Sequence, residues 1–129
     1  MPNRFEGKGN VGSAPTLKTV TVRGEDRQVA EMRVFFDEYS RGEDGEFEQT
    51  GGIWLAVSVW GRRAEQVARL LRKGARVMVQ GELRTFEYTP DGTDVKVPGF
   101  QVVADDVLLT LARVESVVFA AKREEAAAA

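Results

Sequence analysis

Hydrophobic and polar positions alternate most regularly in the middle of the chain, where residues 52–88 read GIWLAVSVWGRRAEQVARLLRKGARVMVQGELRTFEY. From Ile53 to Trp60 the large aliphatic side chains occupy every second position, which is the period of a strand with one buried face. The other face carries Trp54 and Trp60 at its ends, with only alanine and serine between them. We therefore predict a strand whose aliphatic face fills a core, formed by Ile53, Leu55, Val57 and Val59.

The residues after this strand change to a helical period. Gly61 breaks the alternation, and the stretch from Ala64 to Lys73 has the spacing of a short helix that Gly74 stops at its C-terminus. A further strand is predicted over residues 76–83. Because this helix is shorter than the crossover of about a dozen or more residues that parallel strands need, we expect it to cover the end of a small barrel. Its apolar stripe consists of Val67, Leu70 and Leu71.

The flanking segments carry further strand patterns. A glycine-rich strand is expected over residues 3–12, with an extension over 17–22, and a strand over 28–36 places Ala30, Met32 and Val34 in the core. Residues 37–51 are polar and contain several glycines, so we predict a long loop of the kind that is functional or disordered in compact domains. After a turn at residues 89–94, a last strand region covers residues 95–111. The hairpin around this turn is expected to project from the barrel, flanked by Phe86, Tyr88 and Lys96.

The predicted order is strand, strand, strand, short helix, strand, strand. This order is typical of an all-β fold, the five-stranded Greek-key barrel called the OB-fold, with one short helix between strands 3 and 4. Runs of strands with a single helix do not build a doubly wound sheet. With 129 residues and no internal repeat, we expect one domain over residues 1–112 and a short flexible or helical tail over residues 113–129.

The composition excludes several classes of function. The chain has no cysteine and no histidine, which removes thiolate and imidazole catalysis and the usual zinc sites. Asp105 and Asp106 are adjacent, so on a strand they point to opposite faces and form no catalytic pair. Gly7, Gly9 and Gly12 match a dinucleotide-binding fingerprint, but the following residues show no helix start and no βαβ unit. We therefore expect a protein that is not an enzyme and has no cofactor and no metal.

The chain carries no sign of a membrane or secretory segment. No apolar run approaches the roughly 18 residues of a membrane span, and the N-terminus MPNRFEGKGN is not a signal peptide. We expect no membrane partner and a cytoplasmic, nucleoid-associated location.

Charge is distributed unevenly along the chain. The formal net charge is −2, but residues 37–48 contain six acidic residues and one arginine, which gives a local charge of −5. Residues 61–84 contain seven basic and two acidic residues, which gives a local charge of +5. The chain is therefore polarised between an acidic loop and a basic central segment.

Exposed aromatic rings beside cations are what a protein needs to bind single-stranded nucleic acid, because bases stack on the rings and phosphates pair with the cations. If the aliphatic face of residues 53–60 fills the core, Trp54 and Trp60 must face solvent, a ligand or another subunit. Six residues apart on one strand, they would lie about 20 Å from each other. The candidate stacking residues are Trp54, Trp60, Tyr88, Phe35, Tyr39 and Phe86. The candidate phosphate contacts are Lys8, Lys18, Arg33, Arg62, Arg63, Lys73, Arg76, Arg84 and Lys96.

The central segment closely resembles the bacterial single-stranded DNA-binding protein family. In that family an aromatic residue opens the third strand, an aromatic–glycine pair closes it, a helix ends in a Lys-Gly step, and the next strand reads Gly-x-Leu-Arg-Thr before another aromatic residue. The matching residues are Trp54, Val59–Gly61, Glu65–Ala68, Leu71–Gly74, Val77, Gly81–Thr85 and Tyr88. The residues that resemble its second strand and its first-strand turn are Ala30, Met32, Val34, Asn10–Gly12 and Pro15. The resemblance covers roughly residues 4–111.

The resemblance implies a homotetramer of OB-folds that binds single-stranded DNA without sequence preference, in DNA replication, recombination and repair. It assigns base stacking to Trp54, Trp60 and Tyr88, with a fourth aromatic at Phe35 or Tyr39. The chain departs from the family in ending KREEAAAA instead of in an acidic tip with a hydrophobic pair. Recruitment of protein partners through a tail is therefore left without support.

Two other functions fit the same pattern. A primosomal or accessory OB-fold protein would share the fold and act mainly as a dimeric protein-interaction module at replication forks. A structural module would bury both tryptophans between its subunits. The mass of the assembly in solution and the exposure of the tryptophans distinguish these alternatives.

Overall fold

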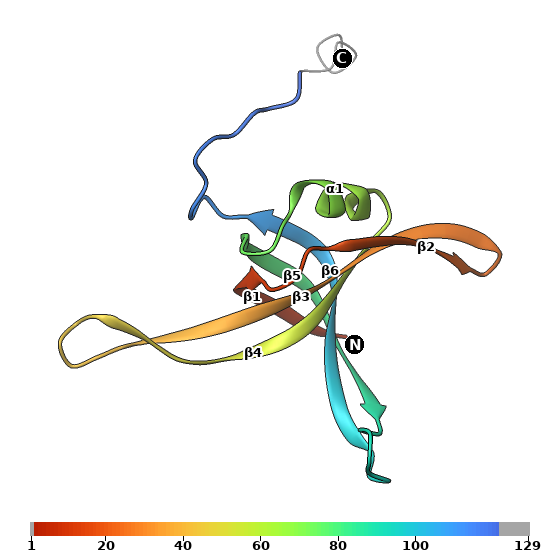
Figure 1. The fold of residues 1–129 in the computed structure, drawn as a ribbon, viewed down its shortest axis with the longest axis horizontal. Helices are drawn as coiled ribbons and strands as arrows, with labels where there is room; N and C mark the ends of the chain where they lie inside the picture. Colours follow the sequence, from red (N-terminus) through yellow and green to blue (C-terminus); the bar gives the residue numbers. More distant parts are fainter. Residues whose placement is uncertain (1, 122–129) are drawn as a thin grey trace.

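A computed structural model describes residues 2–121, which form six strands and one short helix (Figure 1). The strands are β1 (Asn3–Val11), β2 (Thr16–Val22), β3 (Glu25–Arg41), β4 (Phe47–Trp60), β5 (Arg76–Tyr88) and β6 (Val97–Leu109). The helix α1 (Arg62–Leu70) lies between β4 and β5. Residues 114–121 form neither helix nor strand, and the remainder of the predicted tail, residues 122–129, lies outside the described residues.

The strands form one sheet that closes on itself. Their order is β1–β5–β6–β4–β3–β2, and a further pairing of β1 with β3 joins the first five into a ring. The closing pairs are Asn10 with Phe35 and Val11 with Val34. The ring has five strands, and α1 follows the third of them in chain order, as the predicted OB-fold requires. The predicted first strand with its extension is in fact two strands, β1 and β2, of which β2 pairs with β3 outside the ring.

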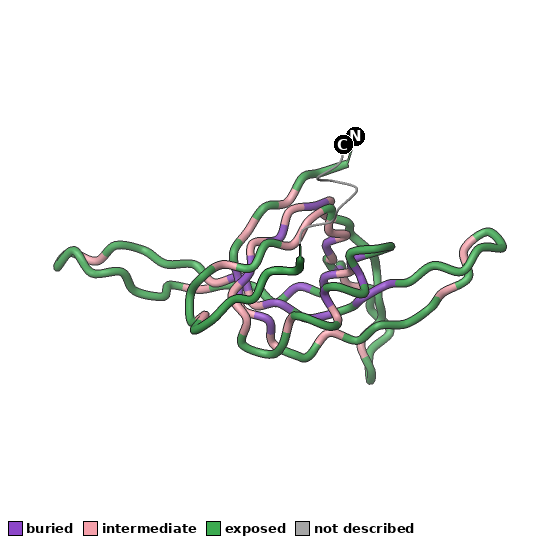
Figure 2. The backbone as a smooth tube through the Cα atoms, turned by 90° about the horizontal axis from the view of Figure 1, so that it is seen from above, coloured by how far each residue is buried: buried purple, intermediate pink, exposed green. Residues whose placement is uncertain are grey.

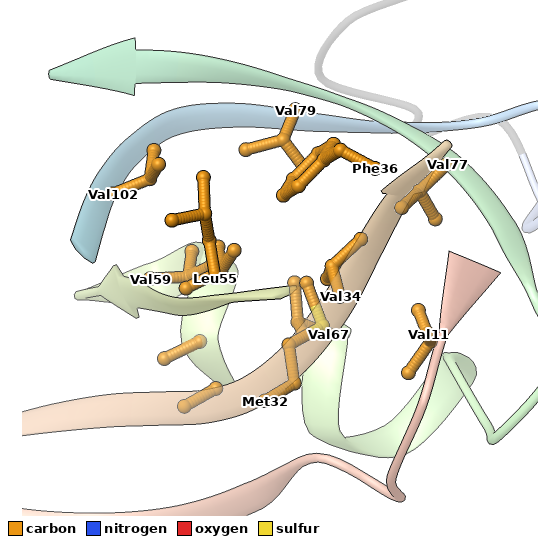
Figure 3. Close-up of a cluster of buried hydrophobic side chains, with 13 residues drawn as sticks. Val11, Met32, Val34, Phe36, Leu55, Val59, Val67, Val77, Val79 and Val102 are labelled. Carbon is orange, nitrogen blue, oxygen red and sulfur yellow. The ribbon is translucent and has the colours of Figure 1, made fainter. Parts of the chain in front are cut away.

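Aliphatic side chains, many of them valines, fill the interior of the ring (Figure 3). Leu55, Val57 and Val59 on β4 are buried together with Met32 and Val34 on β3, as the period of two predicts. Full burial of one such side chain stabilises the fold by about 1.5–3 kcal/mol. These side chains determine which faces of β3 and β4 point inward, and the alternate residues of both strands must point outward.

Ile53 does not belong to the core as predicted, because its side chain is 46% exposed. It pairs with Phe36, while the pairing of β4 with β6 covers only residues 56–59 of β4. Ile53 therefore lies where β3 and β4 leave the ring, beyond the strand that would cover it.

The helix begins two residues earlier and ends three residues earlier than predicted. α1 ends at Leu70, whose side chain is exposed, and Leu71 already has an extended backbone. Val67 is the member of the predicted stripe that is buried, and Leu71 packs against the core only in part. Gly74 has a φ of 93° and lies in the turn before β5, where its N–H donates to the carbonyl of Val11. This glycine therefore directs the chain into β5 and does not stop the helix.

Three hairpins project from the ring in different directions (Figure 1), and Figure 2 shows that most of their residues are exposed. The β2–β3 hairpin turns at Arg23 and Gly24, and the β5–β6 hairpin turns within residues 89–96, as expected for the projecting hairpin. The prediction of a loop over residues 37–51 is wrong. There β3 and β4 continue as paired strands with a turn at residues 42–46, because backbone hydrogen bonds pair polar residues as well as apolar ones.

Gly81 marks a point where β5 and β6 approach each other closely. The pairing of the two strands shifts by one residue between Gln80 and Gly81. A Cβ at Gly81 would lie 2.3 Å from the carbonyl oxygen of Val103 and 2.7 Å from Cα of Ala104. Both are backbone atoms, so the strands would have to separate to admit a side chain.

We expect Gly81→Ala to lower the free energy of unfolding by about 1–3 kcal/mol, the range for overpacking a well-packed site. Gly51→Ala is a matched control on β4, since the nearest atom to its added Cβ is Glu38 Oε2 at 3.8 Å. Urea denaturation measures both variants. Equal stability of the two would contradict the close approach at Gly81.

Candidate nucleic-acid interface

The outward face of β3 and β4 carries both tryptophans. Directly opposed residues on antiparallel strands point to the same side, and the pairs here are Phe35 with Trp54 and Val29 with Trp60. The side chains of Trp54 and Trp60 are 50% and 39% exposed. The structure thus places both indoles outside the ring, on the face that the aliphatic stripe leaves free.

Trp54 is held in position by three neighbours. Its ring centroid lies 5.1 Å from that of Phe35, with the planes tilted by 48°. The guanidinium carbon of Arg33 lies 5.8 Å from the centroid, which is within range of a cation–π interaction. The indole also lies over Gly12, where an added Cβ would come within 2.3 Å of it. These contacts hold one part of the indole in place. The exposed part is therefore already ordered before a ligand binds.

Trp60 lies between two open pockets at the other end of the same face. One has a volume of about 490 Å³ and is lined by Asp26, Arg27, Gln28, Trp60, Gly61 and Arg62. The other has a volume of about 530 Å³ and is lined by Val22, Arg23, Arg27, Trp60, Arg84 and Val103. Each pocket offers an aromatic wall beside at least two guanidinium groups.

Arg23 and Arg27 are absent from the predicted phosphate contacts. The sequence shows them only as part of a polar turn between two strands. They reach Trp60 because β3 pairs with β2 on one side and with β4 on the other, so that the β2–β3 hairpin stands beside the end of β4. One signal in the sequence could have identified them. The turn contains two arginines close together, one on each side of Gly24, Glu25 and Asp26.

The surface between the tryptophans is low and polar. Arg33 pairs with Ala56, Ala56 with Gln101, and Gln101 with Arg84, so one row of residues crosses β3, β4, β6 and β5. Because the side chain of Ala56 is small, the surface at the middle of the row is recessed relative to the two indoles. The row therefore forms the floor of a continuous outward face, with an arginine at each end.

Phe86 and Tyr88 extend this face along β5. Their ring centroids are 6.0 Å apart, and both side chains are exposed. Phe86 covers Gly99, whose added Cβ would lie 2.5 Å from the ring. β5 runs antiparallel to β6 and β6 parallel to β4, so Phe86 lies on the same side of the cross-strand row as Trp54. Two of the predicted stacking residues lie on projecting hairpins, Tyr39 on β3 and Tyr88 at the end of β5.

Several predicted cations are paired with acidic groups. Lys18 forms an ion pair with Glu31, and the other pairs are Arg84 with Glu82 at 3.1 Å, Arg63 with Asp106 at 3.9 Å and Arg76 with Asp37 at 2.6 Å. Exposed pairs of this kind contribute about 0–1 kcal/mol, so Lys18, Arg63 and Arg84 can exchange an acid for a phosphate at little cost. The predicted cations without an ion pair among residues 2–121 are Lys8, Arg33, Arg62, Lys73 and Lys96. Of these, Arg33 and Arg62 lie beside the tryptophans, whereas Lys8 on β1 and Lys73 after α1 lie on segments that carry none of the candidate rings.

Arg76 differs from the other candidates because its partner is buried. Its Nη1 donates to both carboxylate oxygens of Asp37, at 2.8 and 2.6 Å, and approaches Asn10 Oδ1 at 3.4 Å. The side chain of Asp37 is only 2% exposed. The pair joins β1, β3 and β5 where the ring closes, which gives Arg76 a structural contact that the exposed cations lack.

Within the described residues, no group of three or more potential ligand side chains is arranged to hold a metal ion. The same part of the chain includes no helix with the length and apolar character needed to cross a bilayer.

Comparison with known sequences gives one consistent result. Residues 3–110 match the Single-strand binding protein family. The chain is 35% identical over 108 residues to Single-stranded DNA-binding protein 2 of Streptococcus agalactiae serotype III, which covers 80% of this chain and 73% of that protein. It is also 35% identical over 103 residues to the Single-stranded DNA-binding protein of Corynebacterium glutamicum, covering 77% of this chain and 43% of that protein.

Solved structures confirm the predicted fold. A small single-stranded DNA-binding protein from Streptomyces coelicolor superposes with a TM-score of 0.74 at 17% identity, covering 88% of this chain and 98% of that one. The Plasmodium falciparum SSB in complex with ssDNA gives a TM-score of 0.66 at 22% identity, covering 85% and 96%. At these identities the likeness establishes a shared OB-fold, while the contacts of the outward face are properties of this chain.

If Arg76 acts on the fold, Arg76→Ala should lower the free energy of unfolding by about 3 kcal/mol or more, because it leaves the buried Asp37 carboxylate without a partner. Asp37→Asn combined with Arg76→Ala should recover much of that loss, since no buried charge then remains. Urea denaturation of both variants measures the difference. A single variant that keeps its stability and loses affinity for nucleic acid would show that Arg76 is a phosphate contact after all.

Proposed function

The chain belongs to the Single-strand binding protein family, and on this basis we propose that it binds single-stranded DNA without sequence preference. The observation that carries the proposal is the outward face of β4, where Trp54 and Trp60 stay exposed because the alternate residues fill the core. Large exposed rings on a folded protein mark an interaction site.

Stacking supplies affinity at this face without readout of sequence. Every base has a π-face, and a stacked base contributes about 1–3 kcal/mol. The tryptophans lie about 20 Å apart along β4, which leaves room for several nucleotides between them. The residues between them on this face, Ala56 and Ser58, are too short to read base edges at a distance. The site therefore selects flexible strands with exposed bases.

The phosphates require cations, and the arginines that line the pockets at Trp60 supply them. Arg27, Arg62 and Arg84 approach the indole from different elements, and Arg33 fulfils the same role at Trp54. A strand that stacks on either indole thus has a guanidinium beside its backbone. Neutralising phosphates releases condensed counterions, so the affinity should fall as the salt concentration rises.

The proposal extends to a protective role in DNA replication, recombination and repair, and to a homotetramer. Exposed apolar side chains at Leu70, Leu108 and Leu109 support contact between subunits. Sedimentation equilibrium measures the mass of the assembly directly. A dimer that binds single-stranded DNA weakly would instead support an accessory protein of replication forks.

Trp54→Ala and Trp60→Ala should each weaken binding to oligo-dT by about 1–3 kcal/mol, because each removes one stacking platform. Phe119→Ala is the control, since it removes another exposed ring, from the segment after β6. Fluorescence or filter-binding titration gives the dissociation constants. Normal binding by both tryptophan variants would contradict the proposed face.

The chain has two tryptophans, so Trp54→Phe and Trp60→Phe each leave a single indole to observe. Emission from each remaining indole should be quenched when poly-dT is added, and the quenching should weaken with increasing salt. The same titration with oligo-U measures the preference for DNA over RNA. An unchanged emission in both variants would exclude stacking at either site.

A further inference from the structure

The part of the β3–β4 hairpin that projects from the ring, residues 38–51, carries two exposed aromatic residues (Figure 1). We call it the β3–β4 arm. Tyr39 pairs with Gln49 and Arg41 pairs with Phe47, so these four side chains share one face of the arm. Phe47 is 71% exposed, which is more than either tryptophan.

A bulge in β4 determines that the aromatic residues of the arm lie on the same side of the hairpin as Trp54. Glu38 pairs with Gly51 and Tyr39 with Gln49, so Thr50 is an extra residue with no partner on β3. One extra residue exchanges the faces of all residues beyond it on that strand. In a regular strand Phe47 and Trp54 would point to different faces. The bulge places Phe47 on the same face as Trp54. On β3, which has no extra residue there, Tyr39 follows Phe35 on that side by simple alternation.

Contacts on the other face of the arm agree with this assignment. Ser40 Oγ lies 3.2 Å from Thr50 Oγ1, which requires both hydroxyls to point to the same side. A Cβ added at Gly51 would face Glu38 Oε2 at 3.8 Å. The aromatic face of the arm is thus continuous with the face of Trp54 and Phe35, and Glu38 and Ser40 lie behind it.

Arg41 positions Phe47 much as Arg33 positions Trp54. Its guanidinium carbon lies 5.9 Å from the centroid of the Phe47 ring, and its Nε donates to the carbonyl of Gly45 at 3.2 Å. The ring and the cation together have the composition of the other stacking sites. About six strand positions separate Phe47 from Trp54, a distance of about 20 Å.

The acidic residues of the arm lie behind this face or at the tip. Glu38 and Glu48 occupy the back, and Glu43, Asp44 and Glu46 occupy the turn. With Arg41 as the single cation, residues 38–48 carry a charge of −4. These carboxylates lie within about a Debye length of the aromatic face, about 10 Å at 0.1 M salt, so they repel the backbone of a strand that stacks there.

We propose that the aromatic face of the β3–β4 arm, formed by Tyr39, Arg41 and Phe47, is a further subsite for bases of the bound single strand. Phe47 holds a base beyond those at Trp54, and the carboxylates of the arm keep this outer contact weak. The inference rests on the proposed function, because it extends the same strand along the same face. A weak outer contact lets the end of a long strand detach while the tryptophans still hold it.

The test is binding of Phe47→Ala to oligo-dT of increasing length. The shortest oligonucleotide that quenches both tryptophans should bind normally, because it stays on the ring. A strand long enough to reach the arm should bind Phe47→Ala about fivefold more weakly than it binds the unchanged protein, which is the lower end of the loss expected for one stacked base. Phe47→Tyr should keep the affinity, since it retains a ring, and Phe119→Ala should have no effect at any length.

A second variant tests the charge. Glu43→Gln, Asp44→Asn and Glu46→Gln together should strengthen binding of the long strand several-fold at low salt and leave the short one unchanged. This gain should disappear at high salt, where charges are screened.

The outcomes separate this inference from the proposed function. Normal binding of all lengths by Phe47→Ala, with loss in Trp54→Ala, would overturn the subsite and leave DNA binding intact. Equal losses on short and long strands would also overturn it, since Phe47 would then act through the ring. Normal binding by both tryptophan variants would instead overturn the proposed function.

Discussion

The closed sheet requires the inward face of each strand to be apolar, and the other features of the molecule depend on this requirement. Val34, Val57 and Val59 fill the interior of the ring, so the alternate residues of β3 and β4 point to its outside. The tryptophans are exposed as a consequence of core packing. A protein that binds many sequences needs such a face, because its rings must be open before any ligand arrives.

The alternation of apolar and polar residues was enough to predict which face of a strand is buried, wherever the strand pairing is regular. It identified the buried residues of β4 and the outward position of Trp54, because a strand has the same period in every fold. It was wrong at Ile53, since whether a residue is covered depends on where β6 stops pairing with β4. It also gave no reason to select Phe47. The bulge at Thr50 arises from the pairing of β3 with β4, so the residue pattern of β4 alone does not reveal it.

Cations were harder to predict than rings, because their availability depends on partners that are distant in sequence. Arg76 and Asp37 are 39 residues apart and meet only when the ring closes, so nothing in the sequence indicates that this candidate phosphate contact has a buried acidic partner. Arg23 and Arg27 gain their importance from the hairpin that brings them beside Trp60. Residue type and local charge therefore indicated a basic site, while strand pairing determined its members.

The distribution of charge explains how a chain of net charge −2 can bind a polyanion. Electrostatic interactions between exposed groups fade beyond about 10 Å at 0.1 M salt, so a phosphate responds to the arginines near it and not to the sum over the molecule. The acids of the β3–β4 arm lie away from Trp60, where three guanidinium groups line one pocket and Asp26 lines the neighbouring one. In the proposed binding mode the strand is held most firmly at that end of the face and least firmly along the arm. Net charge describes the solubility of this protein, whereas the position of each charge determines where along the face DNA is held.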